Sequence, residues 1–366
     1  MPEHDRKIHR IVITGGPCAG KTSVLTYLKQ ELTEHGLVPI IVPEAARMII
    51  ASGVTPADIG AYEFQRLVMR LQRQHEKQFL TAARLLHGHR VVMLCDRGLM
   101  DSLAYIDSGS FTQLIENENW NVTQLRDRRY EGVIHLLTAA YGAEQYYVTD
   151  SERRETLEDA RTLDDATKAA WTGTPHLRVV DNTGDFESKM HRTLQCVLDI
   201  VGQPVPLEIE RKYLVDRACL ERMPKEAVRI SIEQAYPGTR GRSYDRIRKR
   251  EQDGNAMYVR TVKRSVRKGV REEFEHEMPR SKYQRLFASC GKGQILRKDR
   301  WCFLYENQYF EFDDFGPSES DLCILEIELT EEGQEPLLPP WVQVIREVTH
   351  DDSYGNRELA ERFAIV

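Results

Sequence analysis

The sequence predicts two domains of different fold class: an α/β domain with a parallel sheet, then an α+β domain with an antiparallel sheet. Short β-branched runs alternate with amphipathic helical stretches over roughly the first 200 residues, the pattern of a parallel sheet with helices on both faces. A glycine-rich loop joins the first of these runs to the first helix. Later runs alternate charged and apolar residues, as antiparallel strands with one polar face do. The stretch VGQPVP, whose glycine and prolines end the preceding helix, divides the chain into domains 1–203 and 204–366.

Composition is that of a globular protein. Charged residues make up 30% and hydrophobic ones 41% of the 366 residues, and the net charge of −6 implies no general affinity for nucleic acid. No apolar stretch approaches the ~18 residues that cross a bilayer, and the polar start carries no secretory signal. The seven cysteines are scattered and form no CxxC pair, which indicates a reducing compartment and no zinc site. We therefore expect a cytoplasmic protein without a transmembrane segment.

The first strand, residues 8–14, leads into the loop GGPCAGKTS and a helix with apolar residues on one face. The loop matches G-x-x-x-x-G-K-[ST], the P-loop, in which backbone N–H groups converge on phosphate oxygens. Lys21 is expected to reach the β and γ phosphates as a catalytic group, and the Thr22 hydroxyl to ligate Mg²⁺. The residues expected to bind the nucleotide are Gly15, Gly16, Pro17, Cys18, Ala19, Gly20, Lys21, Thr22 and Ser23.

Four further strands are predicted, over residues 38–42, 91–95, 133–137 and 177–181, with a long helix over 62–86. Glu44 follows the strand 38–42 at the rim where ligands bind in such sheets. It is interpreted as a catalytic base or substrate contact, or else as an N-cap or partner of Arg47. Asp96 ends the strand 91–95 and is expected to hold Mg²⁺ through water, the Walker B role, with a helix N-cap as the alternative. His135, on an apolar strand, is expected to be a core histidine.

A charged segment of helical pattern, residues 147–171, carries Arg153, Arg154 and Arg161. In phosphoryl-transfer folds a mobile segment bearing arginines can close over the phosphates, so Arg154 and Arg161 are candidate catalytic residues of a lid. The alternative is a solvated helix face with i,i+4 pairs such as Arg154 with Glu158.

Residues 7–200 resemble the P-loop ATPase and kinase group that includes the nicotinamide-riboside kinase part of NadR. The stretches TGGPCAGKTS, PEAAR, CDRG and HLRVVDNTG carry this similarity. The resemblance implies that the domain binds a nucleoside triphosphate, ATP or GTP, and acts as an NTPase or small-molecule kinase. Neither the base nor the phosphoryl acceptor follows from these residues.

The second domain opens with LEIERKYLV, residues 207–215, which puts Glu208, Glu210 and Lys212 on one face of a strand. Because burying such a row in an ordinary core is prohibitively costly, the face must meet water, a metal or a highly charged ligand. The alternation recurs in six later runs: Arg246, Arg248 and Arg250; Thr261 and Lys263; Arg271, Glu273, Glu275 and Glu277; Lys298 and Arg300; Glu311 and Asp313; Glu326 and Glu328. Seven runs of mixed sign favour a closed antiparallel barrel of about eight strands with a charged lumen over an ordinary sheet with solvated faces.

These strands resemble, over about residues 205–365, the CYTH family of triphosphate tunnel metalloenzymes, whose signature is ExExK. The resemblance implies an eight-stranded tunnel that binds or hydrolyses an inorganic or organic triphosphate with Mg²⁺ or Mn²⁺. The cations expected to hold the triphosphate are Lys212, Arg246, Arg248, Lys263, Lys298 and Arg300. The expected metal-side carboxylates are Glu208, Glu210, Glu326 and Glu328, with Glu273, Glu275 and Asp313 lining the same cavity. Glu210 is also expected to be catalytic.

The pairing of the two domains resembles the family of the TRPL translocation defect protein of insect photoreceptors. It implies an alternative function, that of a GTP- and phosphoinositide-binding regulator of membrane traffic. The sequence has no polybasic run or amphipathic anchor helix that would favour membrane binding. Turns are expected at 238–242 and 252–255, and helices over 336–348 and 352–363.

Overall fold

The computed structural model describes residues 8–147, 156–202, 210–237, 243–267, 270–316, 321–330 and 333–363, and for 243–244, 263–267 and 270–274 the backbone alone. The chain divides into two compact units, Met1–Val201 and Gly202–Val366. Each unit has its own sheet and its own core.

The first unit is built on a five-stranded sheet of order β2-β3-β1-β4-β5, in which all neighbours are parallel. The strands are β1 (Ile8–Gly15), β2 (Val38–Val42), β3 (Val91–Asp96), β4 (Gly132–Leu136) and β5 (Leu177–Val180). All five predicted strands are confirmed, each to within two residues of its expected ends. β1 lies at the centre, so the glycine loop that follows it leaves from the middle of the sheet.

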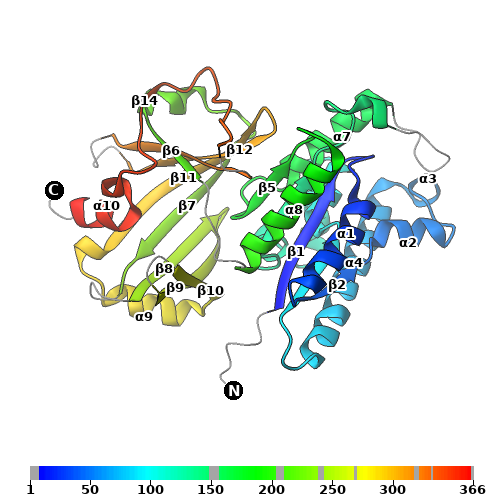
Figure 1. Ribbon diagram of the computed structural model, residues 1–366, viewed down its shortest axis with the longest axis horizontal. Coiled ribbons are helices and arrows are strands. Elements are labelled where there is room, and N and C mark those ends of the chain that lie inside the picture. The colour runs from blue at the N-terminus through cyan, green and yellow to red at the C-terminus, as the bar shows by residue number, and fades with distance from the viewer. Residues whose placement is uncertain are drawn as a thin grey trace. The chain divides into compact units, whose positions relative to one another are not determined.

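Helices cover both faces of this sheet. On one face α1 (Lys21–Glu34) and α8 (Phe186–Val201) pack against β1, β3 and β4 through an apolar core, and Figure 1 shows both helices in front of β1. The predicted long helix is α4 (Ala61–Leu85), which contacts β1, β2 and β3 outside that core. The remaining helices of the unit are α2 (Ala45–Ala51), α3 (Pro56–Ile59), η2 (Leu99–Ala104), α5 (Ser108–Asn117), α6 (Val122–Leu125), η3 (Glu144–Tyr146) and α7 (Leu157–Ala170).

The second unit contains an antiparallel sheet of order β10-β9-β8-β7-β11-β12-β13-β6-β14. Its strands are β6 (Glu210–Val215), β7 (Val228–Ala235), β8 (Ser243–Gln252), β9 (Asn255–Arg267), β10 (Val270–Glu277), β11 (Ile295–Tyr305), β12 (Gln308–Asp314), β13 (Cys323–Glu328) and β14 (Val344–Glu347). The predicted number of about eight strands is one short of the nine in the described ranges. Within those ranges the pairings run in one line, with β10 and β14 at its ends, and do not close into the expected barrel.

The ninth strand overturns a prediction. Residues 336–348 do not form the expected helix, because their last part is β14, which pairs with β6. The run holds four β-branched residues after the pair Pro339-Pro340, and such residues favour an extended strand over a helix: Val342, Val344, Ile345 and Val348. The expected helix over 352–363 is confirmed in the main as η7 (Asp352–Tyr354) and α10 (Asn356–Phe363).

The strand register puts the predicted charged rows on a single face of this sheet. In the strand register Arg300 lies opposite Asp313, and Glu311 lies opposite Glu326. In every other neighbouring pair of strands from β6 to β10, the residues of the charged rows likewise lie on this face. The opposite face carries two apolar clusters beside further charged residues: an aromatic cluster on β6, β11, β12 and β13, and a second cluster under α9 (Arg280–Ala288). One end of the charged face packs against α10.

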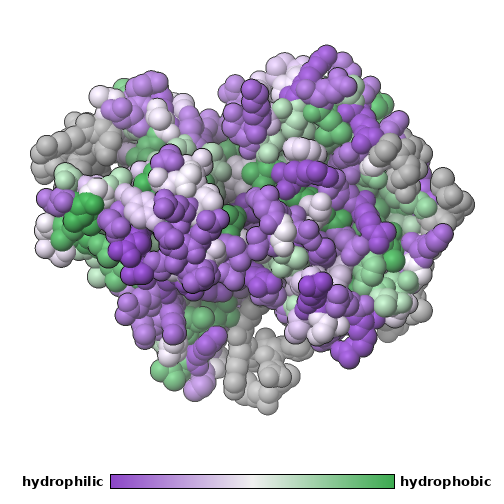
Figure 2. Space-filling model, turned by 180° about the vertical axis from the view of Figure 1, so that it is seen from behind, coloured by the Kyte–Doolittle hydropathy of each residue, from purple (hydrophilic) through white to green (hydrophobic). Residues whose placement is uncertain are grey.

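No helix in the described ranges is long and apolar enough to cross a membrane. Figure 2 shows a mostly hydrophilic face on which hydrophobic residues lie in small separate groups.

Candidate functional site

The glycine loop between β1 and α1 folds tightly around its own lysine. Gly15 and Gly20 have φ angles of 148° and 84°, in the region that favours glycine. A Cβ atom on Gly15 would lie 2.2 Å from the carbonyl oxygen of Leu136, so the loop passes too close to β4 for a side chain. Lys21 Nζ donates hydrogen bonds to the carbonyl oxygens of Gly15 and Gly16, at 3.1 and 3.2 Å. The ammonium therefore lies over the loop that the motif assigns to phosphates.

The other loop residues take the places that the motif requires. Pro17, Cys18 and Ala19 form the bend, with Cys18 at a φ angle of 55°. Thr22 and Ser23 lie in the first turn of α1 and are exposed. The Thr22 hydroxyl is thus accessible to an ion or a phosphate at the helix N-terminus.

Acidic and basic side chains gather around Lys21 from the ends of β2 and β3. Arg97 lies 3.3 Å from Glu44 (Nε to Oε1) and 3.6 Å from Asp101 (Nη1 to Oδ2). Glu44 occupies the N-cap position of α2 without a side-chain capping bond, so its ionic partner is Arg97. Among the described residues, Glu44 therefore pairs with Arg97 and not with Arg47, the partner considered from the sequence. The buried Oδ1 of Asp96 accepts no hydrogen bond from a described residue.

Burial and charge shift the pKa values of this cluster. Burial, together with the nearby Arg97, lowers the pKa of Lys21 to about 8. Burial, together with Glu44, raises the pKa of Asp96 to about 6, against the pull of Lys21 and Arg97. An unpartnered buried carboxylate oxygen with a raised pKa fits a site for a divalent cation, because a cation would stabilise the ionised form.

Asp101, which sequence reasoning did not assign to the site, joins this cluster to the core. Its Oδ2 accepts a hydrogen bond from Thr14 Oγ1 at 2.7 Å, and its Oδ1 accepts one from Trp171 Nε1 at 2.6 Å. The carboxylate is buried, so it holds the Arg97 guanidinium from a rigid position. The only sequence signal was its place five residues after Asp96, on the short helix that follows β3.

Asp164 of α7 is a second residue that the sequence did not single out. Its Oδ1 accepts hydrogen bonds from the backbone N–H groups of Gly16 and Thr138, at 2.9 and 3.0 Å. Its Oδ2 lies 3.1 Å from His135 Nε2 and 3.4 Å from Lys168 Nζ. Although burial opposes it, His135 and Lys168 hold the pKa of Asp164 well below its usual range. His135 is fully buried, as predicted for a core histidine, and it is also the partner of this carboxylate.

Lys189 of α8 ties the loop to the end of the sheet. Its Nζ donates hydrogen bonds to the carbonyl oxygens of Leu137 and Ala19, at 2.7 and 3.2 Å, and to Asn182 Oδ1 at 2.7 Å. Burial lowers its pKa to about 8. Asn182 belongs to the stretch DNTG, which resembles the kinase group, but Lys189 had no motif that could have identified it.

Arg161, the described residue of the predicted lid, lies on α7. Its Nε donates to the carbonyl oxygen of Ala140 at 2.8 Å, and its Nη2 to Glu144 Oε1 at 3.1 Å. The guanidinium also lies over the Tyr141 ring, 5.5 Å from its centroid. These contacts tie α7 to the segment after β4. Arg153 and Arg154 lie outside the described residues, so a lid remains a prediction.

The charged face of the second unit is an ion-pair network centred on Arg300. Its guanidinium donates to both oxygens of Asp313 at 2.7 Å, to Glu326 Oε2 at 2.7 Å, and to Glu311. Lys298 Nζ contacts the same Asp313 at 2.5 Å. Asp313, a predicted cavity carboxylate, is therefore fully buried between two cations, and a metal ion could reach it only if those contacts opened.

Lys212 continues the network toward β6. Its Nζ lies 2.9 Å from Glu210 Oε1 and 3.4 Å from Glu326 Oε1. Burial opposes protonation, but Glu326 and Glu210 raise the pKa of Lys212 overall. Arg300, Lys298 and Lys212 in turn lower the pKa of the buried Glu326 to about 2. The structure thus brings together six of the predicted site residues in one network: Glu210, Lys212, Lys298, Arg300, Asp313 and Glu326.

A second group of cations lies on β8. Arg246 Nη2 donates to Thr261 Oγ1 at 3.2 Å and lies 3.7 Å from Glu275 Oε2. Arg248 forms no hydrogen bond or ion pair with any residue in the described ranges, and its Nε is buried. Burial, followed by the neighbouring Arg246, lowers the pKa of Arg248 to about 10. Arg250, two residues further along the same face, is buried as well.

The predicted metal site is only partly covered by the described residues. Glu208 lies outside them, as do the side chains of Glu273 and Lys263. Among the side chains described, no three of histidine, cysteine, aspartate or glutamate form a group that could hold a metal ion. The register nevertheless puts Glu210 directly opposite Glu328 on the neighbouring strand. Two facing carboxylates repel each other, and a divalent cation between them would remove that cost.

Comparisons with known proteins bear on both units. The family model described as AAA domain matches residues 10–189. An inorganic triphosphatase of Nitrosomonas europaea is 31% identical over 157 residues, which are 42% of this chain and 96% of that protein. An inorganic triphosphatase of Acetivibrio thermocellus is 29% identical over 154 residues, 42% of this chain and 93% of that protein.

Solved structures resemble the chain over a similar share of its length. The crystal structure of the inorganic triphosphatase NE1496 is 28% identical, with a TM-score of 0.34, over 42% of this chain and 95% of that one. A structure of the protein PH1819 from Pyrococcus horikoshii OT3 is 19% identical, with a TM-score of 0.26, over 35% of this chain and 80% of that one. By its 31% identity over nearly the whole length of the Nitrosomonas protein, the chain belongs to the family of these inorganic triphosphatases.

Proposed function

We propose that the chain is a two-site phosphate enzyme. The second unit binds a triphosphate on its charged face and hydrolyses it with the help of Mg²⁺ or Mn²⁺. The first unit binds ATP or GTP at its glycine loop and hydrolyses it or transfers its γ phosphate to a small molecule. The family membership and the match to the AAA domain model support this pairing.

The single observation that carries the second-unit proposal is the unpartnered Arg248. A guanidinium with a buried Nε, beside two further arginines and without a described partner, costs free energy unless an anion neutralises it. A triphosphate carries several negative charges and many acceptor oxygens, so it matches such a cluster. The burial of Arg250 and Thr261 on the same face is the property expected of a strongly curved sheet that encloses its own charges, as a tunnel does.

Divalent metal is proposed on the carboxylate side of this face. Glu210 and Glu328 would hold it, with Glu208 as a third ligand that the sequence predicts. When bound, the ion would polarise a phosphoryl oxygen or lower the pKa of an attacking water. Glu326 stays ionised at neutral pH, since its pKa is about 2, and it orients Lys212 and Arg300 toward the phosphates. Lys298, Arg246 and Lys263 are proposed as further phosphate contacts.

In the first unit, Lys21 would contact the β and γ phosphates. Mg²⁺ would be held by Thr22 and, through water, by Asp96, whose Oδ1 has no described partner. Glu44 and Arg97 lie beside that position as an ion pair and are proposed to contact the acceptor or the attacking water. In that role Glu44 would be a catalytic base or a substrate contact, which is one of the two interpretations that the sequence allows.

A phosphate-release assay on the full chain tests both sites at once. Inorganic tripolyphosphate, ATP and GTP are offered with Mg²⁺ or with Mn²⁺ to wild type, Lys21→Ala and Glu210→Ala. Glu210→Ala should lose tripolyphosphate hydrolysis and Lys21→Ala should keep it. If wild type releases phosphate from none of the three substrates, the proposed enzyme activity is wrong.

A GTP- and phosphoinositide-binding regulator is the alternative, and the observation that favours it is the same arginine cluster, which could accept a phosphorylated headgroup. Liposomes with and without phosphoinositides, sedimented with wild type and with Arg248→Ala in the presence or absence of GTP, distinguish the two. Binding that requires the phosphoinositide, GTP and Arg248 would favour the regulator. Equal partitioning onto neutral and phosphoinositide liposomes would remove it.

A further inference from the structure

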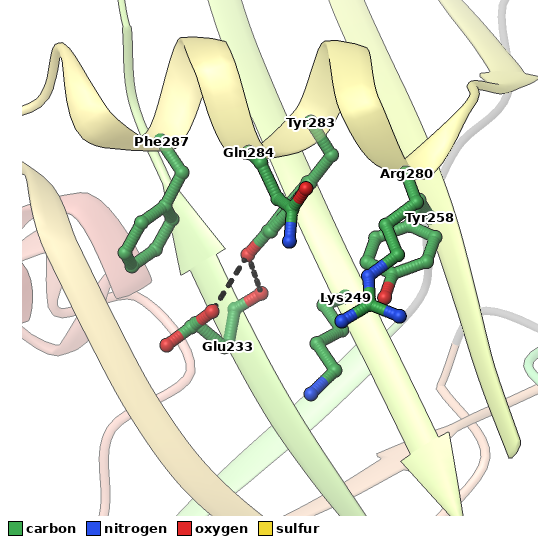
Figure 3. A pocket seen from close by; sticks show the side chains of 7 residues that line it. All are labelled: Glu233, Lys249, Tyr258, Arg280, Tyr283, Gln284 and Phe287. Carbon is green, nitrogen blue, oxygen red and sulfur yellow. Dashed lines mark hydrogen bonds between the residues drawn. The ribbon is translucent and has the colours of Figure 1, made fainter.

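A pocket of about 180 Å³ opens between helix α9 and the sheet of the second unit (Figure 3). Three of its lining residues, Glu233, Lys249 and Tyr258, come from β7, β8 and β9. They form a row across the strands, because Glu233 pairs in register with Lys249 and Lys249 with Tyr258. The floor of the pocket is therefore a continuous part of the sheet.

The other wall is one face of α9. Arg280, Tyr283, Gln284 and Phe287 line the pocket, and their spacing of three, four and seven residues puts them on the same side of a helix. Figure 3 shows Arg280 extending from the start of the helix toward Tyr258 and Lys249. The pocket is thus built from two rigid elements.

This pocket lies on the face of the sheet opposite the charged face. Successive residues of a strand point to opposite sides, and Lys249 stands between Arg248 and Arg250 on β8. A ligand in the pocket would therefore be separated by the sheet from the cations that are proposed to hold a triphosphate. Nothing proposed for the phosphate sites uses its residues.

Arg280 is the cation with unused hydrogen-bonding capacity in the pocket. Its exposed guanidinium makes no hydrogen bond or ion pair with any residue that the structure describes. Glu233 is already occupied, since it accepts hydrogen bonds from Tyr283 Oη at 3.1 Å and from Arg297 Nε at 2.9 Å. Lys249 lies 2.5 Å from Glu251. An incoming anion would therefore meet five unused N–H donors of a guanidinium.

Aromatic rings form the side of the pocket next to Arg280. The Tyr258 and Tyr283 rings lie 5.0 Å apart, centroid to centroid, at an interplanar angle of 48°, and the Tyr283 and Phe287 rings lie 5.6 Å apart and nearly parallel. Tyr258 and Tyr283 are buried, so their positions are set by packing. A flat apolar body would gain contact area on these rings at little cost in ordering.

We propose that this pocket binds a small organic anion, an aromatic ring that carries a carboxylate or a phosphate, with the anion on Arg280 and the ring against Tyr258. The guanidinium supplies a planar pair of donors that matches either anion. The small volume restricts the ligand to one ring and its substituent. The site is distinct from both phosphate sites and does not depend on the proposed activities.

Calorimetry on the full chain tests this with three probes of one shape: benzoate, phenyl phosphate and the neutral benzamide. Benzoate and phenyl phosphate represent the two sources of the anion, and binding of either one through Arg280 supports the site. Arg280→Gln should weaken that binding by about 10-fold or more, since a charge-assisted hydrogen bond is lost. Gln284→Glu, which adds a negative charge to the pocket wall, should weaken it as well.

The matched control is Arg285→Gln, an exposed arginine of α9 that does not line the pocket and should leave the affinity unchanged. Since Arg280 and Gln284 are exposed, neither change should disturb folding, and circular dichroism verifies this. Failure of both anions to bind overturns the proposal. So does benzamide binding as tight as that of the anions, or binding of both anions that Arg280→Gln leaves unchanged, which would assign the probes to another site.

Discussion

The carboxylate of Asp164 accepts a hydrogen bond from the backbone N–H of Gly16 at 2.9 Å, which joins helix α7 to the glycine loop. A Cβ atom on Gly16 would lie 2.7 Å from the Cβ of Asp164, so the contact also excludes any larger residue from this loop position. The same carboxylate holds Thr138 at the end of β4. One buried group therefore fixes the loop, the sheet edge and the helix of the predicted lid relative to one another.

Asp164→Asn should lower the free energy of unfolding by about 3 kcal/mol, because Lys168 would lose its buried counter-charge and His135 its carboxylate partner. The two backbone N–H groups could still donate to the amide oxygen, so the loss is mainly that of charge. Urea unfolding measures it. Asp165→Asn is the control: that side chain is 53% exposed, and its loss should cost about 1 kcal/mol or less. Equal stability of the two variants would show that Asp164 is not an anchor.

Lys21→Ala should weaken ATP and GTP binding at the glycine loop by at least about 10-fold, because the charge-assisted contacts to phosphate are removed. Calorimetry with Mg²⁺ on a Glu210→Ala background separates this site from the second unit. Lys29→Ala, an exposed lysine of the same helix, should bind as wild type does. Unchanged nucleotide binding in Lys21→Ala would refute the assignment of the loop.

The pH dependence of kcat/KM for NTP turnover at the first unit should be bell-shaped. Asp96 must be ionised to hold a metal-bound water, so activity should rise as the pH increases through about 6. Lys21 must be protonated to bind phosphate, so activity should fall as the pH increases beyond about 8. In Asp96→Asn the residual activity should lose the acidic limb and keep the alkaline one. A profile that is flat between pH 5 and 9 would contradict both assignments.

Arg161→Ala should slow turnover at the first unit more than it weakens nucleotide binding, by about 10-fold or more in kcat, if the arginine acts on the transition state. In the structure Arg161 is held by Ala140 and Glu144, so it must leave them to act. Glu144→Gln should therefore raise or preserve kcat, since it weakens that restraint. The same comparison applies to Arg154→Ala. Wild-type turnover in both arginine variants would support the alternative, that these arginines belong to a solvated helix face.

In the second unit, variants of a metal ligand should lose catalysis, whereas variants of a phosphate contact should lose binding. Glu210→Ala removes a proposed metal ligand and should cut tripolyphosphate hydrolysis by about 100-fold or more while the anion still binds. Arg248→Ala should weaken tripolyphosphate binding itself by about 10-fold or more, because it removes an unpartnered phosphate donor. Calorimetry with and without Mg²⁺, beside a phosphate-release assay, distinguishes them. Arg229→Ala, an arginine half-exposed at 57%, is the control.

Local patterns predicted the parts of the fold that depend on neighbours in the sequence. The period of two in the charged runs put Glu210 with Lys212, and Arg246 with Arg248, on one face of a strand, and the register confirms that these rows share one face of one sheet. The glycine pattern of the first loop likewise predicted its place between a strand and a helix. The alternating strand faces and the glycine loop both follow from steric preferences of a few consecutive residues.

The failed prediction over 336–348 has a different cause. Prolines at its start and charged residues near its end resemble a short helix, but β6 offers an unpaired edge to which Val344 and Glu347 can bond. A strand of four residues has little preference of its own. Its partner, more than 120 residues earlier in the chain, decides its conformation, and no local pattern reports that partner.

The sequence by itself determined the two fold classes, the phosphate loop and the charged face, because each depends on a motif or a periodic pattern within a short stretch of residues. Only the tertiary structure decided which carboxylates form ion pairs with which cations. Asp164 reaches Gly16 across 148 residues of sequence, and Arg300 gathers Asp313 and Glu326 from two other strands. The physical reason is that a charged residue is expected from the sequence to be exposed to solvent. Whether it forms an ion pair instead depends on its burial, and burial is a property of the packed fold.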